Sequence, residues 1–170
     1  MGQTVIDFFA KLFGDGHELV VILASAIPVT EMRATIPLGI LKYGMDPIWT
    51  GLLALFGTCL PVPLLLLFFE RFLRYIKKVR WLGWFSNFLE NKVQKNAKKV
   101  EKYAEIGLII FVGIPLPGTG LWTGSMVASF LGFDFKKSFL CVFLGGVMSA
   151  VIMVVLCWLI QLGAIQLNLF

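Results

Sequence analysis

Glu31 and Arg33 are the residues of this sequence best suited to chemistry, because both lie inside an apolar stretch. They belong to the segment Pro28-Val29-Thr30-Glu31-Met32-Arg33-Ala34-Thr35-Ile36-Pro37. An ionisable side chain inside a membrane costs at least about 2.5–3.5 kcal/mol on insertion scales, so it needs a partner, water or a substrate. The two charges could pair and fix the segment. Alternatively, they could form a substrate site, with Glu31 as a proton-coupling residue if burial favours its neutral form.

A second polar segment, Pro115-Leu116-Pro117-Gly118-Thr119-Gly120-Leu121-Trp122-Thr123-Gly124, interrupts a later apolar stretch. Its glycines let the backbone approach a ligand, or simply allow tight packing. Thr30 and Thr119 can each cap the helix that follows. If both helix N-termini converge at mid-membrane, their amides and Arg33 would bind an anion such as phosphate or carboxylate. The candidate substrate-binding residues are Thr30, Glu31, Arg33, Gly118, Thr119, Gly120, Trp122 and Thr123.

The composition requires a bilayer around these segments. Hydrophobic residues make up 58% of the 170 residues, charged residues 15%, and the mean hydropathy is +0.87. Soluble domains are about 45–50% apolar and about 25% charged. This excludes an ordinary soluble enzyme, a disordered chain and a nucleic-acid-binding module, and it predicts a multi-pass protein of the cell (inner or plasma) membrane.

Two segments are long enough to span the bilayer, residues 48–69 and 139–162, and Pro61 and Pro63 should kink the first. Each polar segment is instead flanked by half-length arms, which predicts a re-entrant helical hairpin. For residues 18–43, one kinked spanning helix is the alternative. Residues 1–16 form a short amphipathic helix at the interface. The connector carries a second surface helix, with its apolar side chains between Trp81 and Val93.

The two halves of the chain resemble each other at an offset of 87–88 residues. The matching pairs are Ile27-Pro28 with Ile114-Pro115, Gly44-Met45-Asp46 with Gly132-Phe133-Asp134, and Leu55-Phe56-Gly57 with Phe143-Leu144-Gly145. Gly145-Gly146 also permits close helix contact. One hairpin and one span give each half an odd number of crossings, so the second half is inverted. We therefore expect an all-α integral membrane protein built from an inverted repeat of a re-entrant hairpin plus a transmembrane helix, with interfacial amphipathic helices.

The chain is predicted to be one membrane domain, residues 1–170, with repeats at 17–70 and 106–163 and a basic connector at 71–105. The connector holds ten Lys or Arg against three Glu, whereas the whole chain is +5. The positive-inside rule places the connector and Lys136-Lys137 in the cytoplasm, and both termini outside. A full span at 18–43 would move the N-terminus inside.

The sequence shows no residue pattern that indicates a metal site, a cofactor site or an enzyme active site. Cys59, Cys141 and Cys157 lie in apolar runs without a second ligand at a metal spacing, and no disulfide framework is apparent. The one histidine, His17, lies outside both polar segments, and no nucleophile constellation appears. We therefore expect no enzyme activity, no cofactor, no metal and no nucleic-acid partner. A homodimer is compatible with a chain of this size.

The two polar segments also resemble a known family. Thr30-Glu31-Met32-Arg33-Ala34-Thr35-Ile36-Pro37-Leu38-Gly39-Ile40 is similar to the E-[LM]-R-x-x-I-P-L-G-I signature of the small multidrug export proteins, and residues 115–124 to their P-L-P-G-T-G-x-W-T-G signature. That family is similar to the DedA/VTT membrane proteins, which implies re-entrant hairpins and lipid movement, with polyprenyl-phosphate recycling as the best-defined case. The arginine motif of the second DedA hairpin is absent, because Gly and Thr stand there.

The sequence therefore predicts a transporter or lipid flippase with a site at mid-membrane. Its partners would be the lipid bilayer and an anionic amphipathic substrate; the resemblance implies one such as a polyprenyl-phosphate lipid, with proton coupling through Glu31 as an option. The alternatives are a small-molecule or drug exporter and a non-transporting structural or assembly protein that acts through the basic connector.

Overall fold

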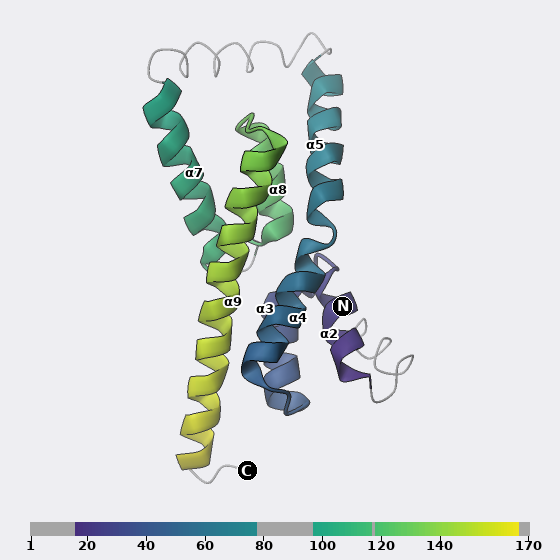
Figure 1. The fold of residues 1–170 in the computed structure, drawn as a ribbon, viewed down its shortest axis with the longest axis vertical. Helices are drawn as coiled ribbons and strands as arrows, with labels where there is room; N and C mark the ends of the chain where they lie inside the picture. Colours follow the sequence, from purple (N-terminus) through teal and green to yellow (C-terminus); the bar gives the residue numbers. More distant parts are fainter. Residues whose placement is uncertain (1–15, 78–96, 117, 167–170) are drawn as a thin grey trace.

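The computed structural model describes residues 16–77, 97–116 and 118–166 (Figure 1). Every regular element in these ranges is helical, which confirms the all-helical prediction. The elements are α2 (His17–Ser25), α3 (Glu31–Pro37), the π-helix η1 (Leu38–Lys42), α4 (Pro47–Cys59), α5 (Val62–Lys77), α7 (Ala97–Gly113), α8 (Leu121–Phe130) and α9 (Phe135–Gln166). The interfacial helix predicted at 1–16 and the connector helix predicted around 81–93 lie outside the described residues.

Two helical stretches are long and apolar enough to cross a membrane, Pro47–Phe69 and Phe135–Gly163. They correspond to the two predicted spans. The first is interrupted at Leu60 and Pro61, between α4 and α5. Proline has no backbone N–H to donate and its ring crowds the preceding turn. The predicted kink is therefore confirmed, and it takes the form of a break between two helices.

Two helix pairs complete the fold. A turn at residues 26–30 joins α2 to α3, and residues 114–120 join α7 to α8. Both connections are shorter than the predicted polar breaks, since Glu31–Pro37 and residues 121–124 are helical. Polar residues and glycine are tolerated in the first turn of a helix, which is why composition alone placed the boundaries too far along the chain. Glu31 and Arg33 therefore lie on α3 and not in the connecting turn.

The helix containing Glu31 changes its winding after one proline. Pro37 cannot donate a hydrogen bond to the carbonyl four residues earlier, and the helix continues as the π-helix η1. Across this change Met32, Ile36 and Ile40 remain fully buried at a spacing of four residues. They form one apolar face that holds the helix in the protein interior.

Each helix pair packs against the helix that follows it in the chain. The first pair, α2 and α3, contacts α4, and the second pair, α7 and α8, contacts α9. The returning helices also reach the other half, because α3 contacts α9 and α8 contacts α5. In Figure 1 the two connecting turns meet near the middle of the molecule, with the pairs extending toward opposite ends.

The matched sequence pairs occupy matching places in the structure. Gly44 and Gly132 both have a positive φ, +64° and +72°, in the turns before α4 and α9. A Cβ on Gly57 would meet the backbone of Ile22, and one on Gly145 would lie 2.9 Å from the Ile109 carbonyl oxygen. In both halves, therefore, the first helix of the pair crosses the helix that follows the pair at a glycine. The close contact predicted for Gly145 is confirmed.

Candidate functional site

Glu31 begins α3 in an unusual backbone conformation. Its φ is +39°, the positive φ described for a residue other than glycine, and its side chain is only 7% exposed. Left-handed φ values are uncommon for residues with a Cβ and persist where the surrounding structure holds them. The Glu31 amide donates to the Ile27 carbonyl oxygen at 2.9 Å. This bond ties the residue to the turn between α2 and α3.

The Glu31 carboxylate caps a helix of the other half. Its Oε1 accepts a hydrogen bond of 2.7 Å from the backbone N–H of Leu121, the first residue of α8. The preceding residue, Gly120, is buried, and a Cβ at this position would overlap the carboxyl group. The N-terminus of a helix carries unpaired N–H groups and partial positive charge, so a carboxylate is favourable there.

Arg33 binds the C-terminal end of α7, the helix that precedes α8 in the chain. Its Nη2 donates to the carbonyl oxygens of Val112, at 3.2 Å, and Ile114, at 3.3 Å, and its Nη1 donates to the carbonyl oxygen of Leu116. These residues lie at or just beyond the C-terminus of α7, which ends at Gly113. Terminal carbonyl groups lack helical partners and carry partial negative charge, which a guanidinium neutralises.

Glu31 and Arg33 therefore connect the first helix pair, α2 and α3, to the second pair. They bind on both sides of the connection between α7 and α8. The carboxylate meets the positive end of α8 and the guanidinium meets the negative end of α7. In the described part of the chain both side chains bond to backbone groups of the other helix pair. We call this set of contacts the tip latch, formed by Glu31, Arg33, the Leu121 amide and the carbonyl groups of Val112, Ile114 and Leu116.

The predicted anion site does not appear in this arrangement. The N-terminus of α8, where phosphate was expected, carries the Glu31 carboxylate, and Arg33 is committed to carbonyl groups. An incoming anion would have to displace Glu31. The sequence located the charged residues, and a substrate-binding role for Glu31 and Arg33 stays a prediction.

Neither threonine caps a helix. Thr30 has a helical backbone, and its hydroxyl donates to the Ala24 carbonyl oxygen at the end of α2. Thr119 donates to the carbonyl oxygens of Ile114, at 2.8 Å, and Leu116, at 3.0 Å, because Gly120 is the residue that precedes α8. A capping side chain needs an extended backbone at the position just before the helix. Thr30 lacks that conformation and Thr119 lacks that position.

The other predicted site residues lie around the same turn. Gly118 has a φ of +89° and is exposed, which fits a tight turn. A Cβ on Gly124 would press on Val112, so this glycine allows α8 to pack on α7. The Thr123 hydroxyl donates to the Gly120 carbonyl oxygen at 3.0 Å. These three residues shape the break and its packing.

Two hydrogen-bond donors in this region have no partner among the described residues. They are the indole Nε1 of Trp122 and the Nε of Arg33. A buried donor without an acceptor is costly, so most such groups in proteins are satisfied. Both remain able to bind an acceptor atom of a ligand, and the substrate role predicted for Trp122 and Arg33 stays a prediction.

Sequence reasoning missed the groups that complete the latch, because all of them belong to the backbone. The Leu121 amide and the Val112, Ile114 and Leu116 carbonyl groups are 79 to 90 residues away from the side chains that bind them. Gly120 was the available signal, since its lack of a side chain makes room for the Glu31 carboxyl group.

Comparison with known proteins gives one result. Residues 31–152 match the family model described as "Putative small multi-drug export protein". The match begins at Glu31, covers both helices of the second pair, and spans more than two thirds of the 170 residues. No curated protein and no solved structure matches the chain.

Proposed function

The chain belongs to the family of putative small multi-drug export proteins, and from this premise we propose that it is a secondary exporter of small amphipathic molecules. It is a membrane protein, with two helical stretches apolar enough to span. We place it in the cell membrane as a multi-pass protein. The proposal involves no covalent step and no cofactor.

We further propose that the two helix pairs are re-entrant hairpins that enter the bilayer from opposite sides, as inverted repeats. The matched glycine crossings at Gly57 and Gly145 support this, and so do the matched turns at Gly44 and Gly132. In the same scheme the C-terminal end of α5 and the N-terminal end of α7 face the cytoplasm, because the sequence between them is strongly basic. Broken helices that meet near mid-membrane are typical of transporters.

The capping of α8 by Glu31 carries the functional proposal. A carboxylate of one half holds a helix end of the other half, in a buried place where a charge is expensive. A substrate can pass between the helix pairs only if these contacts open. Protonation removes the charge that favours the helix N-terminus, so proton uptake at Glu31 would weaken the latch and couple its opening to a proton gradient.

The test uses purified protein in proteoliposomes with an imposed pH gradient and ethidium as the transported probe. Glu31→Gln keeps an oxygen that can accept from the Leu121 amide but cannot take up a proton at physiological pH. We expect gradient-driven ethidium movement to fall at least about tenfold. Glu105→Gln is the matched control, because Glu105 pairs with Lys137 at 3.4 Å outside the latch. Wild-type rates in Glu31→Gln would refute the coupling role.

Lipid flipping is the second candidate, and the unpaired donors of Arg33 and Trp122 favour it, since both suit a phosphate oxygen. The related idea, a DedA-like carrier of polyprenyl phosphate, is tested in the same liposomes with a fluorescent polyprenyl-phosphate analogue and an impermeant quencher. If the wild-type protein flips the analogue but does not move ethidium, and Arg33→Gln abolishes the flipping, the function is that of a flippase and not of an exporter.

A further inference from the structure

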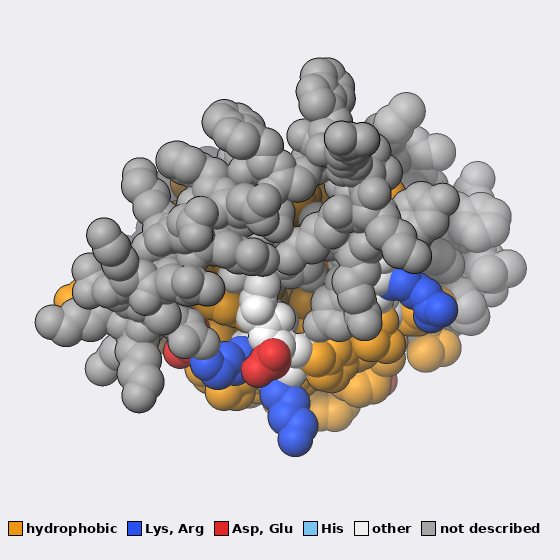
Figure 2. Space-filling model, turned by 90° about the horizontal axis from the view of Figure 1, so that it is seen from above, with side chains coloured by type: hydrophobic (Ala, Val, Ile, Leu, Met, Phe, Trp, Pro, Cys, Tyr) orange, Lys and Arg blue, Asp and Glu red, His pale blue; other side chains and the backbone are white. Residues whose placement is uncertain are grey.

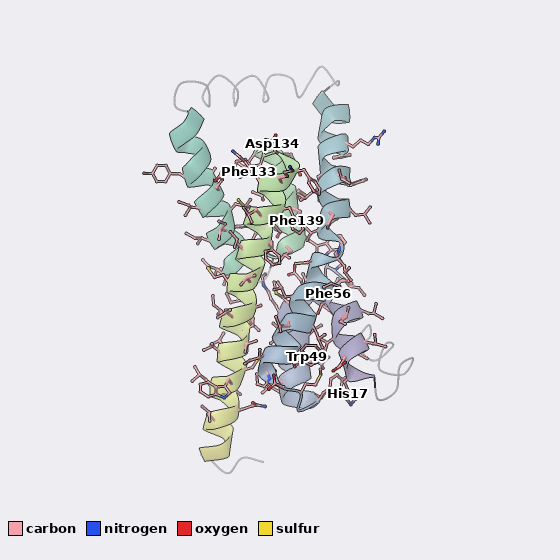
Figure 3. All side chains as sticks on the ribbon, viewed as in Figure 1. His17, Trp49, Phe56, Phe133, Asp134 and Phe139 are labelled. Carbon is pink, nitrogen blue, oxygen red and sulfur yellow. The ribbon has the colours of Figure 1, made fainter. Side chains whose placement is uncertain are left out.

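A hollow of about 510 Å³ lies at one end of the molecule, away from the tip latch. It is formed between the start of α2 and the turn that leads into α4, and its lining includes His17, Glu18, Leu19, Met45, Asp46 and Trp49. Figure 3 shows His17 and Trp49 near this end, whereas Asp134 lies toward the other. Small-molecule sites in proteins commonly have volumes of about 300–1,000 Å³, so the hollow is large enough for a drug-sized ligand.

Two carboxylates bind Trp49, that of Glu18 at the indole ring and that of Asp46 at the backbone. Its Nε1 donates to Glu18 Oε1 at 2.7 Å, and its backbone N–H donates to Asp46 Oδ1 at 2.9 Å. Trp49 is still 48% exposed, so part of its side chain remains accessible. An ionised carboxylate can accept about four hydrogen bonds, which leaves Glu18 and Asp46 with acceptor capacity toward the hollow.

A neighbouring aromatic ring at this end already binds a cation of the chain. The Lys42 ammonium lies 5.9 Å from the centre of the Tyr43 ring, and His17 stacks on that ring with 4.3 Å between the ring centres. Positive groups are attracted to aromatic faces, most strongly to that of tryptophan. The partly exposed Trp49 ring can offer the same interaction to a cation from solution.

The charge of the hollow differs in sign from that of the opposite end. Its lining includes two carboxylates and neither Lys nor Arg. The opposite end carries the exposed Arg71, Lys136 and Lys137, the last of which pairs with Glu105. Figure 2 looks onto that end and shows Lys and Arg side chains at the edge of the described surface. Within a chain of net charge +5, the hollow is therefore a local acidic site.

From the cavity, the fixed indole and the two carboxylates together, we propose that this hollow binds a small organic cation, with its positive centre between Glu18 and Asp46 and its apolar groups on Trp49. Its role as the exit site of the exporter rests on the proposed function and on the topology that puts this end outside. Binding itself depends on neither.

The experiment measures equilibrium binding of labelled tetraphenylphosphonium to the full chain in nanodiscs, with empty nanodiscs as the background for partition into lipid. Glu18→Gln and Asp46→Asn are informative because each keeps an oxygen for its hydrogen bond to Trp49 and removes only the charge. We expect each to weaken binding about threefold and the double variant about tenfold, because exposed ion pairs contribute modestly. Trp49→Leu should weaken binding by a similar factor.

Asp134→Asn is the matched control. It removes a carboxylate from the corresponding Gly-x-Asp turn at the other end and should leave the affinity unchanged. Nanodiscs with and without phosphatidylethanolamine separate two sources of the cation. Weaker binding with this lipid shows that its ammonium headgroup occupies the hollow, and equal binding shows selectivity for the free cation, so both outcomes keep a cation site.

Two results would overturn the proposal: tetraphenylphosphonium binding equal to that of empty nanodiscs, or wild-type affinity in the Glu18→Gln/Asp46→Asn double variant. The outcome is independent of the transport assay. Cation binding in a protein that moves no ethidium would remove the exporter and keep the site. Ethidium transport by a wild-type protein that binds no tetraphenylphosphonium above background would remove the site and keep the exporter.

Discussion

Glu31 and Arg33 are two residues apart, yet each neutralises a different helix end in the other half of the molecule. Glu31 holds the N-terminus of α8 through the Leu121 amide, and Arg33 holds the C-terminal carbonyl groups of α7. A charge at a helix end contributes about 0.3–2 kcal/mol, depending on burial. The latch is thus an energetically modest contact between two halves, which suits the opening that our proposed export function requires.

Replacing Arg33 by lysine tests the geometry of the latch. The planar guanidinium reaches three carbonyl groups through its two Nη atoms, whereas an ammonium is a compact point charge on a flexible chain. We expect Arg33→Lys to lower the free energy of unfolding by about 1–3 kcal/mol, measured by thermal melting in detergent. A variant as stable as the wild type would show that charge alone is enough.

Gly120 tests the space that the carboxyl group of Glu31 needs. A Cβ at this position would overlap that group, so Gly120→Ala should force the latch open and destabilise the protein by about 1–3 kcal/mol. Gly107→Ala in α7 is the control, since a Cβ added there would have nothing within 4 Å and alanine favours a helix. Equal melting temperatures for the two variants would contradict the contact.

At the scale of elements, proline and glycine determine how the helices are divided and how closely they pack. Pro61 separates α4 from α5, and Pro37 precedes the change from α3 to η1. Farther along the chain, Gln161 of α9 donates from Nε2 to the Ile40 carbonyl oxygen at 3.2 Å. A polar side chain in an apolar helix thus binds the π-helix, whose irregular winding leaves carbonyl groups available.

The glycine crossings provide the test at this scale. Gly57→Ala and Gly145→Ala each place a methyl group against the backbone of the neighbouring helix, so both should destabilise the fold by about 1–3 kcal/mol. Gly163→Ala, in the same helix as Gly145 but with nothing within 4 Å, should have little effect. If Gly57→Ala were neutral while Gly145→Ala destabilised, the two halves would not be equivalent.

For the whole molecule, the distribution of charge distinguishes two ends. The Glu105–Lys137 pair and Lys136 lie at the end where α7 begins and α9 starts. The acidic hollow near Trp49 lies at the other end. In the topology that we propose, the positive-inside rule places the first end in the cytoplasm.

Cysteine labelling tests this orientation and the inversion of the repeats together. In a background without Cys59, Cys141 and Cys157, Asp46→Cys and Asp134→Cys place one thiol in each of the two equivalent turns. We expect an impermeant maleimide added to intact cells to label the first variant, and to label the second only after permeabilisation. Labelling of both from the same side would refute the inverted arrangement.

The sequence determined the properties that depend on local composition. The length of the apolar runs located the two candidate spans at 48–69 and 139–162, Pro61 predicted the break in the first, and the Gly-x-Asp turns indicated a repeat, which stays a prediction. Glu31 and Arg33 were recognisable because a charge in an apolar stretch is expensive wherever the chain folds. Each of these signals is read from the order of residues along the chain and needs no knowledge of three-dimensional contacts.

Only the tertiary structure decided what those charges bind. The partners of Glu31 and Arg33 are amide and carbonyl groups of the backbone. Because such groups occur all along the chain, no pattern of side chains could predict which of them would be the partners. The capping predicted for Thr30 and Thr119 failed for the same reason, since a cap depends on the backbone angles that packing imposes on the turn. The charged residues of the site could therefore be identified from the sequence. Their contacts depended on which helix ends the fold places next to them.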